Sequence, residues 1–488
     1  MNHLPIYLLA LGLLMGCAQS QQTTTEEVPK LQYAFSKKIK SINTQLKGYW
    51  KSIGHGYILD ASADSIRLYS YTKSFCYREK NDYLERLMNS QTQFHQKNDT
   101  LSIFLMDFGP QTTHLQSRRD FVRIQKLPEN HLSFDELQQL PPLKLFDLFI
   151  ETLEENYAFS KERKLEWAKI RKDLSEKISD STTHEALFQM MGKITKSTKD
   201  HHTKIIAKDG RKLQYTRTPS AQYVIDLFRK QTAVSQLNKY FGLYFDNNYK
   251  NISDSLLKGK GQKVANQKIE WGSLSEQIGY IHIHSLTGFA DSKLPRKQHI
   301  DTLNYHMAQI IKALQDKEAL IIDISFNFGG YDAAGLTIAS YFTDTSRLAY
   351  QIQVFQQGQF YDESPLYVRP AKGARFTKPV YLLMTDISRS AAETFAMQMK
   401  AIPQVKLVGM PTLGILSDML GKSIGPFYTT SSNRRYVAPD GKVYEVSGVI
   451  PDIPLQVFAA NNTFNSHKNA VSQLANMVER NEVALKGF

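Results

Sequence analysis

The residue types best suited to covalent chemistry lie in the stretch 388-SRSAAE-393, just after the apolar run 379-PVYLLM-384. Its second serine, Ser390, is followed three residues later by Glu393, which is the spacing of a helix capping box. The local pattern therefore allows two interpretations. Ser390 either only caps a helix, or it is a nucleophile held at a strand-to-helix turn, where an adjacent base could activate its hydroxyl.

Three further stretches contain the groups that a serine nucleophile would need. The stretch 200-DHHT-203 offers a histidine as base, and 445-EVSGVIPD-452 begins with a carboxylate. The stretch 323-DISFNFGG-330 follows an apolar strand and ends in Gly329 and Gly330, where the main chain could approach a developing oxyanion closely. Taken alone, the two glycines would indicate an ordinary tight turn after a strand.

In order and spacing, these stretches and 279-GYIHIHSLTGF-289 resemble the C-terminal-processing (tail-specific) serine peptidases. The closest pattern is that of the tricorn-like branch, which has a histidine base, and the resemblance covers about residues 140–458. It implies a crotonase-like α/β core and a serine endopeptidase that acts through an acyl-enzyme. It also implies a peptide or unfolded protein as substrate, and no metal or organic cofactor.

The resemblance assigns roles to individual residues. It implies a catalytic set made of the nucleophile Ser390, the base His202 and the acid Glu445. It implies an oxyanion hole formed by the main-chain N–H groups of Ala391 and of Gly329 or Gly330. By the logic of a catalytic triad, the histidine takes the serine proton, and the acid orients or stabilises the histidine directly or through another side chain.

The identity of the base depends on two comparisons with the family pattern. The lysine-dependent branch has a lysine where this sequence has Ile415, so a serine–lysine dyad is not expected. His201 competes with His202, and the register of the motif favours His202. His282 and His284 share one face of a predicted strand, a spacing that could hold zinc, but no third ligand is recognisable.

The N-terminus carries a targeting signal. Residues 4–16 form an apolar run that is too short to span a bilayer as a helix, and 14-LMGC-17 resembles a bacterial lipobox. Cleavage before Cys17 would leave a cysteine that carries lipid, followed by the polar stretch 18–27. The sequence therefore predicts a lipoprotein anchored to a membrane of the bacterial cell envelope, facing the periplasm or the surface.

The charge balance is basic, with 60 Lys and Arg against 47 Asp and Glu and a formal net charge of +13. In an exported protein whose basic residues are scattered along the chain, this balance does not indicate nucleic-acid binding. We therefore expect no nucleic-acid partner, and the sequence leaves the oligomeric state open.

The hydrophobic pattern changes along the chain from short strands to helices and then to alternating strands and helices. It predicts an α/β protein with a helical lead-in and a separate small antiparallel β domain. The expected segments are a signal peptide (1–16), a polar tether (17–42), the β domain (43–132), a helical and mixed subdomain carrying the base (140–275), the α/β peptidase core (276–460) and a C-terminal helix (461–488).

One substitution keeps a second function open. Ser325 stands where the family motif commonly has arginine, which is compatible with a non-catalytic peptide- or ligand-binding lipoprotein on the same fold. The stretch between His202 and Gly279 also lacks a convincing carboxylate-binding loop of a PDZ domain. Cleavage strictly at free C-termini is therefore not expected.

Overall fold

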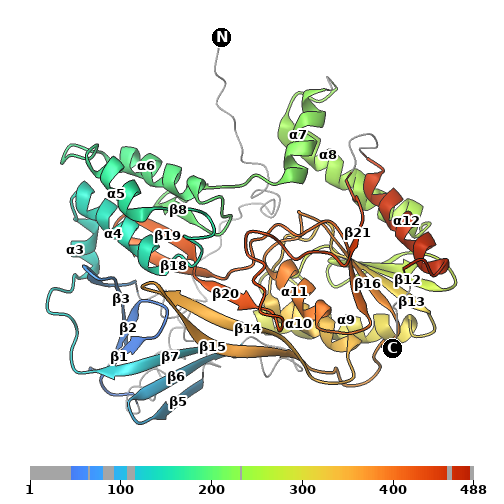
Figure 1. Cartoon of the computed structure of the whole chain (residues 1–488), viewed down its shortest axis with the longest axis horizontal. Helices are drawn as coiled ribbons and strands as arrows, with labels where there is room; N and C mark the ends of the chain where they lie inside the picture. The colour runs from blue at the N-terminus through green and yellow to red at the C-terminus, as the bar shows by residue number, and fades with distance from the viewer. Residues whose placement is uncertain are drawn as a thin grey trace.

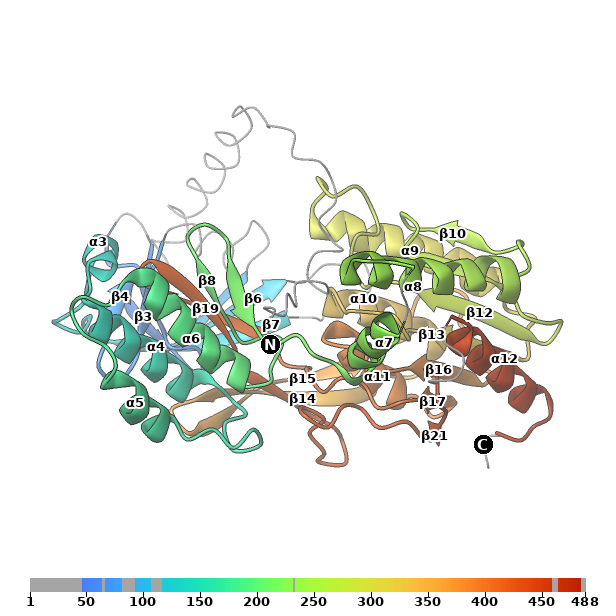
Figure 2. The ribbon, with the colours of Figure 1, turned by 90° about the horizontal axis from the view of Figure 1, so that it is seen from above.

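The structure is a computed structural model that describes residues 46–63, 66–80, 93–106, 116–230, 233–458 and 464–483. The described chain forms two lobes that lie side by side, joined by a long β-hairpin (Figures 1 and 2). The predicted signal peptide, the tether and Cys17 lie outside the described residues. In the described part of the chain, no helix has the length and apolar character needed to cross a membrane.

The N-terminal region forms a seven-stranded antiparallel sheet in the order β4-β3-β2-β1-β7-β6-β5. Alternating apolar residues such as Trp50, Leu59 and Leu101 are buried on one face. The strands are β1 (Tyr49–Ser52), β2 (Tyr57–Asp60), β3 (Arg67–Tyr71), β4 (Cys76–Arg78), β5 (Gln93–Lys97), β6 (Thr100–Met106) and β7 (Gln116–Ile124).

Helices and a small sheet complete this lobe. The helices are α3 (Phe134–Gln138), α4 (Pro142–Asn156), α5 (Trp167–Ser175) and α6 (His184–Ser197). The sheet has the order β18-β19-β8-β9, with strands β18 (Met419–Ile424), β19 (Phe427–Ser432), β8 (Lys204–Ala207) and β9 (Lys212–Gln214). Because β8 pairs with β19, the segment 200–203 that precedes β8 is held against the C-terminal part of the chain.

Buried polar contacts dock the N-terminal sheet onto this small sheet. The Lys422 ammonium donates to the Gly56 carbonyl oxygen at 2.6 Å, and the Tyr57 hydroxyl donates to the Gly421 carbonyl oxygen at 2.7 Å. The Ser423 N–H donates to the Glu79 carboxylate at 3.2 Å. The N-terminal sheet is therefore linked to the strand that follows the 414–417 segment, and it is not an isolated module.

The second lobe is built on a seven-stranded sheet in the order β10-β11-β12-β13-β16-β17-β21. From β12 to β21 neighbouring strands are parallel, whereas β10 and β11 pair antiparallel. The strands are β10 (Gln262–Val264), β11 (Ile269–Ser273), β12 (Ile278–Ile283), β13 (Ala319–Asp323), β16 (Val380–Met384), β17 (Val405–Gly409) and β21 (Ile453–Pro454).

Helices cover both faces of this sheet, as a mostly parallel sheet requires. One hydrophobic cluster joins Ile281 and Ile322 to helices α9 (Arg296–Ala313), α10 (Asp332–Ala339) and α11 (Ala391–Lys400). A second cluster joins Tyr280 and Ile321, which point to the opposite face, to helices on that side. These helices and turns are α7 (Pro219–Arg229), α8 (Leu237–Lys250), η1 (Asn251–Leu256) and α12 (Ser466–Glu479), while η2 (Ser340–Phe342) follows α10.

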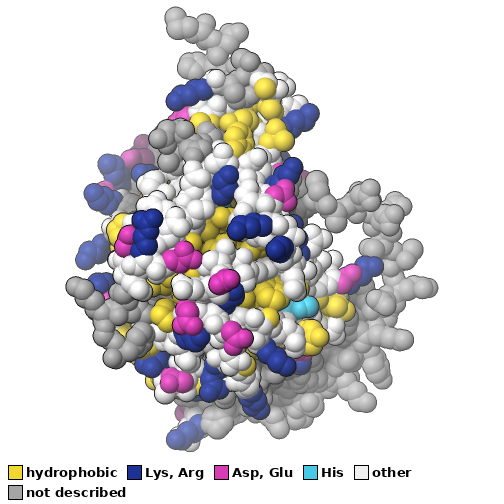
Figure 3. Space-filling model, turned by 90° about the vertical axis from the view of Figure 1, so that its right-hand side faces the viewer, with side chains coloured by type: hydrophobic (Ala, Val, Ile, Leu, Met, Phe, Trp, Pro, Cys, Tyr) yellow, Lys and Arg dark blue, Asp and Glu magenta, His cyan; other side chains and the backbone are white. Residues whose placement is uncertain are grey.

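The long hairpin β14 (Arg347–Gln356) and β15 (Gln359–Val368) pairs with β20 (Arg434–Val437) in a three-stranded sheet between the lobes (Figure 1). The side view in Figure 3 shows basic and acidic side chains interspersed over the described residues of that face. The topology also aligns two loops that matter for the site. Since β13 and β16 are adjacent and parallel, the segments that follow Asp323 and Met384 leave the same edge of the sheet.

Candidate active site

Ser390 lies at the turn between β16 and α11 and has a strained backbone. Its φ of 58° and ψ of −127° place it in a region that residues with a side chain rarely adopt. The Glu393 carboxylate accepts the Ser390 N–H at 3.1 Å, which is the backward half of the predicted capping box. Ser390 is half-buried, so its side chain lies at the boundary between the core and solvent.

Glu393 is fully buried and holds the loop opposite Ser390. One of its oxygens accepts hydrogen bonds from the Thr412 hydroxyl at 2.6 Å and the Gly414 N–H at 2.7 Å. Its other oxygen accepts from the Ile415 N–H at 2.9 Å as well as from Ser390. Burial raises the pKa of Glu393 to about 7, although these hydrogen bonds oppose the shift.

Gly329 packs directly against the serine turn, with a φ of 93°. A β-carbon at this position would lie 2.7 Å from the Arg389 carbonyl oxygen and 2.9 Å from the Ser390 β-carbon, so a side chain would not fit. The Gly329 N–H donates to the Asn327 side-chain oxygen at 2.8 Å. In the same segment, the Asn327 amide donates to the Ile283 carbonyl oxygen at 2.9 Å, which ties this loop to β12.

Gly330 and Ala391 have main-chain N–H groups that donate no hydrogen bond within the described residues. Gly330 lies against Leu286, where a β-carbon would come within 2.4 Å of the Leu286 carbonyl carbon. Ala391 is the first residue of α11, where free N–H groups and the helix dipole favour negative charge. Two donors are therefore available beside Ser390, one from each loop.

The main chain of His202 is held by side chains of neighbouring segments. Its N–H donates to the Asp200 carboxylate at 2.8 Å, and its carbonyl oxygen accepts from the Thr430 hydroxyl at 2.5 Å. The ring Nδ1 is buried and has no hydrogen-bond partner among the described residues. Burial lowers the pKa of His202, while Asp200 and a contact with the Ser417 main chain oppose this shift.

His201, the competing base, has both ring nitrogens engaged. Nε2 lies 3.2 Å from the Arg217 carbonyl oxygen, and Nδ1 lies 3.4 Å from a guanidinium nitrogen of Arg389. Burial and, to a smaller extent, the nearby Arg389 lower the pKa of His201 to about 3. At neutral pH this ring is therefore uncharged, and the Nδ1 lone pair faces an arginine that can donate to it.

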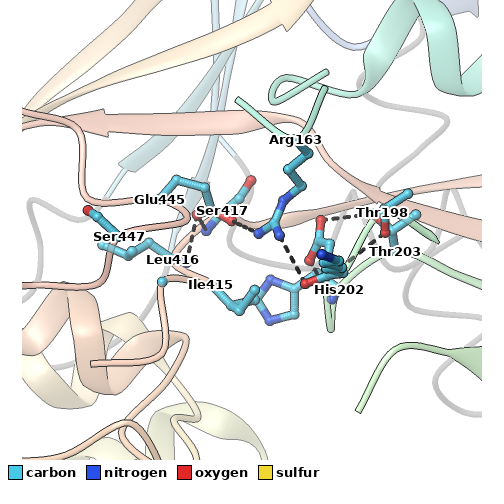
Figure 4. Close-up of polar contacts among 12 residues, drawn as sticks. Arg163, Thr198, His202, Thr203, Ile415, Leu416, Ser417, Glu445 and Ser447 are labelled. Carbon is cyan, nitrogen blue, oxygen red and sulfur yellow. Dashed lines mark hydrogen bonds and ion pairs between the residues drawn. The ribbon is translucent and has the colours of Figure 1, made fainter. Parts of the chain in front are cut away.

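Glu445 lies beside the segment that follows Ile415 (Figure 4). Its Oε2 accepts hydrogen bonds from the main-chain N–H groups of Leu416 at 2.7 Å and Ser417 at 3.0 Å. Its Oε1 lies 3.6 Å from a guanidinium nitrogen of Arg163, which reaches from the other lobe. Arg163 in turn donates to the Lys199 carbonyl oxygen at 2.9 Å, next to the segment that carries His202.

The carboxyl groups near His202 have opposite pKa shifts. Burial raises the pKa of Glu445 well above its usual range, and Asp200 adds to this effect while Arg163 opposes it. Burial would also raise the pKa of Asp200, but Arg163 and His202 outweigh it and hold this pKa below its usual value. Asp200 is therefore the anionic partner of His202, and protonation is favoured at Glu445.

The segment 414–417 contacts all three residues predicted to be catalytic. The Ile415 carbonyl oxygen accepts the Ser390 N–H at 3.1 Å, Glu445 binds the two N–H groups that follow, and the His202 ring contacts the Ser417 main chain. The described structure has no direct hydrogen bond between Ser390 and His202 or between His202 and Glu445. The three residues thus converge on one short segment without forming a closed triad.

Sequence reasoning missed three residues of this region. Asp200 was part of the quoted Asp-His-His-Thr stretch, so its place next to the histidine pair was an available signal. Arg389 was likewise part of the quoted 388–393 stretch, next to Ser390. Arg163 had no comparable signal, because its contact with Glu445 is made across a long stretch of chain. His282 and His284 pack against Tyr249 away from this region, and the described residues contain no group of three His, Cys, Asp or Glu suited to a metal ion.

A comparison with protein families supports the class of serine peptidase. Residues 277–455 match the model described as Peptidase family S41, so the chain carries a domain of that family. This match confirms the resemblance found in the sequence. It spans β12 to β21, which include Gly329, Gly330, Ser390 and Glu445, whereas His202 lies outside the matched residues.

Several solved structures are similar to this chain at low sequence identity. A protein of Parabacteroides merdae, described as a candidate peptidase, is 20% identical with a TM-score of 0.55, over 70% of this chain and 97% of its own. Mature CPAF is 12% identical with a TM-score of 0.49, over 70% of this chain and 98% of its own. A photosystem II D1 C-terminal processing protease is 13% identical with a TM-score of 0.40, over 66% and 95% of the two chains.

Proposed function

We propose that this protein is a serine endopeptidase of the bacterial cell envelope that hydrolyses peptide bonds through an acyl-enzyme. Ser390 is the nucleophile, His202 is the general base, and Glu445 is the supporting acid. The observation that carries the proposal is the strained backbone of Ser390 at the start of α11, packed against a glycine that leaves no room for a side chain. A serine that only capped a helix would not require this strain.

The oxyanion hole of this proposal uses the N–H groups of Ala391 and Gly330. Both groups are free of hydrogen bonds among the described residues and belong to the two loops that meet at Ser390. Gly329, the other predicted donor, gives its N–H to Asn327. Its contribution is steric, because its missing side chain lets the serine turn approach the loop.

His202 fits the role of base better than His201. A general base needs a neutral ring nitrogen that is free to accept a proton, and Nδ1 of His202 has no hydrogen-bond partner in the described part of the chain. The ring of His201 is occupied on both sides by Arg217 and Arg389. In the reaction, His202 would take the proton from the Ser390 hydroxyl as its oxygen attacks the carbonyl carbon, and would then give that proton to the leaving amine.

Glu445 acts indirectly in this proposal. Its carboxyl group positions the main chain at Leu416 and Ser417, and the Ser417 main chain contacts the His202 ring. Arg163 connects Glu445 with Asp200, whose charge favours a protonated His202. This route corresponds to the expectation that the acid works through another group.

The finer features of the proposal come from the sequence and from its resemblance to the C-terminal-processing serine peptidases. The α/β lobe is taken as a crotonase-like core, the substrate as a peptide or unfolded protein, and no cofactor is assigned. The short apolar run before Cys17 supports a lipid anchor at that residue, with the enzyme facing the periplasm or the cell surface. Mass spectrometry of the native N-terminus tests this point, and an unmodified residue beyond 17 would refute it.

Labelling with a fluorophosphonate probe tests the enzymatic function. The full chain should form one covalent adduct, and peptide mapping should locate it at Ser390. A folded protein that takes up no probe and cleaves no unfolded protein would instead favour the non-catalytic peptide- or ligand-binding function. Ser325 stands where the family motif commonly has arginine, and this difference is compatible with that alternative.

A further inference from the structure

Arg389, the residue before the candidate nucleophile, has a guanidinium group fixed beside the site. Its central carbon lies 4.6 Å from the centroid of the Phe328 ring, and one of its nitrogens lies 3.4 Å from Nδ1 of His201. Its main-chain N–H is directed at the Asn327 carbonyl oxygen at 3.3 Å. The side chain therefore lies between the glycine loop and the histidine segment.

This guanidinium has no carboxylate partner in the described chain, since Arg389 forms no ion pair there. Other buried arginines of the region do have one. Arg163 faces Glu445 at 3.6 Å, and Arg434 contacts Asp418 at 2.9 Å. The nearest acid that influences Arg389 is Glu393, and both oxygens of Glu393 already accept hydrogen bonds from the 412–415 segment and Ser390.

An unpaired guanidinium in a desolvated position is costly unless an anion completes it. Burial lowers the pKa of Arg389 to about 10, with Glu393 opposing the shift, so the group is still charged at neutral pH. It is not sealed off, because the residue is partly exposed. An incoming ligand can therefore supply the missing charge.

The geometry of the group selects the chemistry of that ligand. A guanidinium presents a planar set of donors that matches a carboxylate, and such charge-assisted pairs are stronger than neutral hydrogen bonds. The Phe328 ring holds this plane from one side. Since Phe328 precedes Gly329 and Arg389 precedes Ser390, a carboxylate bound here would lie near the reacting peptide bond.

We propose that Arg389 is a specificity-determining residue that binds a carboxylate of the substrate close to the scissile bond. The carboxylate is either the side chain of an Asp or Glu residue or the free C-terminus of a short peptide. This inference rests on the proposed function, because it places the substrate at Ser390. It goes beyond that function by giving the peptidase a preferred class of substrate.

The first experiment uses the full-length wild-type protein and a peptide substrate chosen from sites that it cleaves in a digested protein mixture. Two matched pairs are compared, one with Glu against Gln beside the scissile bond, and one with a C-terminal acid against an amide. A hydrogen bond to a charged group changes kcat/KM by about 10- to 100-fold. We expect a difference of this size in at least one pair, and the pair that shows it identifies the source of the carboxylate. Ratios below about twofold in both pairs would overturn the proposal.

The second experiment changes the arginine. Arg389→Gln should abolish the discrimination, because it should raise KM for the acidic peptide far more than KM for the neutral peptide. Arg389→Lys should retain part of the preference. The matched control is Arg435→Gln, which removes another arginine stacked on an aromatic ring, Phe360, outside the site. This control should keep the wild-type preference.

The outcomes separate the two proposals. If Arg389 only supports His201, then Arg389→Gln will slow cleavage of acidic and neutral peptides equally, and the carboxylate proposal is overturned. If this variant does not fold, the wild-type peptide pairs still decide the question. A wild-type protein that neither labels nor cleaves would overturn the proposed function itself, whereas one that labels and cleaves without discrimination would overturn only the role of Arg389.

Discussion

The two lobes meet around one histidine–carboxylate cluster, and a second such cluster lies inside the α/β lobe. In the second cluster, His467 and Asp323 are in direct contact, with 2.6 Å between Nε2 and Oδ2. In the first, the described residues give the His202 ring no such contact with a carboxylate, and His202 is linked to Glu445 through the main chain and Arg163. Judged by this distance alone, the pair in the second cluster would be taken for part of a catalytic triad.

The surroundings of the second cluster indicate a structural role. Asp323 and His467 are fully buried, and the Tyr280 hydroxyl and the Ser325 N–H also donate to the Asp323 carboxylate, at 2.5 and 2.8 Å. Burial alone would raise the pKa of Asp323, but His467 and its other neighbours hold it far below its usual range. The pair fastens helix α12 to the end of β13, just before the glycine loop.

The comparison shows that exposure to solvent distinguishes the two clusters better than hydrogen-bond length does. Ser390, Arg389 and His202 are all partly exposed, so a substrate can reach them. No solvent reaches Asp323 or His467. The geometry of an unliganded site can also be looser than that of a substrate complex, whereas a structural pair must be complete in the folded chain itself.

The largest expected effect concerns the two serines of the turn. Ser390→Ala should reduce peptide hydrolysis by a factor of about a million, as the loss of a catalytic serine does in comparable enzymes, and should abolish probe labelling. Its folding should be nearly unaffected, since the loss of a cap costs only about 1 kcal/mol. Kinetics and thermal unfolding measure both properties. A folded Ser390→Ala protein with wild-type turnover would leave the residue as a helix cap only.

Ser388 is the matched control for that experiment. Its hydroxyl is fully buried, donates to the Ile324 carbonyl oxygen at 2.8 Å and accepts the Thr385 N–H at 3.1 Å. Ser388→Ala should therefore label and cleave, but lose about 1–3 kcal/mol of stability because the buried partners are left without a hydrogen bond.

The second-largest expected effect is the loss of rate on replacing one of the two adjacent histidines, and its size should differ between them. Removing a general base typically costs a factor of about 10²–10⁴ in rate, so His202→Ala should lose that much in kcat/KM. His201→Ala should lose less, because its ring contacts Arg389 and has no free nitrogen. Parallel kinetics of the two variants on one peptide give the answer. The reverse order would assign the base to His201.

In the second cluster, we expect a substitution to lower the stability of the protein without abolishing its reaction at Ser390. His467→Gln leaves the buried Asp323 without its histidine, and breaking a buried pair costs about 3–5 kcal/mol. Denaturant unfolding should show this decrease, while the folded fraction should still label at Ser390. His306→Gln, on the outer side of helix α9, is the control and should change stability by less than about 0.5 kcal/mol. A fully folded His467→Gln protein that no longer labels would make this cluster part of the site.

The smallest expected effect is the pH dependence. Because burial lowers the pKa of His202, the ring stays neutral below the ordinary histidine pKa of about 6.5. The acid limb of kcat/KM should therefore have its midpoint below pH 6.5. The pKa values of His202 and His201 are lowered in the folded protein. As the pH falls, the unfolded chain therefore binds protons at these residues before the folded protein does. Their contribution to stability should thus decline as the pH falls below about 6.5. A rate midpoint at or above pH 6.5 would contradict the shift.

Much of the α/β lobe could be predicted from local pattern. The apolar runs 279–286, 319–324, 379–384 and 405–410 correspond to β12, β13, β16 and β17, because strands buried on both faces read as continuous hydrophobic stretches. The β14–β15 hairpin and the small antiparallel sheet that pairs β8 with β19 were not predicted. Their partners lie far apart in sequence, and the period of one strand does not specify which other strand it meets.

The sequence alone determined that a serine follows a buried strand and opens a helix, and that two glycines follow the neighbouring strand. It also narrowed the base to two adjacent histidines. These properties depend on residue type and short spacing, which the chain carries locally.

Only the tertiary structure decided how these residues are used. Packing between the lobes occupies the ring of His201 and leaves a nitrogen of His202 free, and local folding of the glycine loop commits the N–H of Gly329 to Asn327. Among the residues that the structure describes, the fold also leaves the guanidinium of Arg389 without a counter-ion beside the serine. Hydrogen-bond partners and charge pairing are set by which segments meet in space, so no local pattern could have shown them.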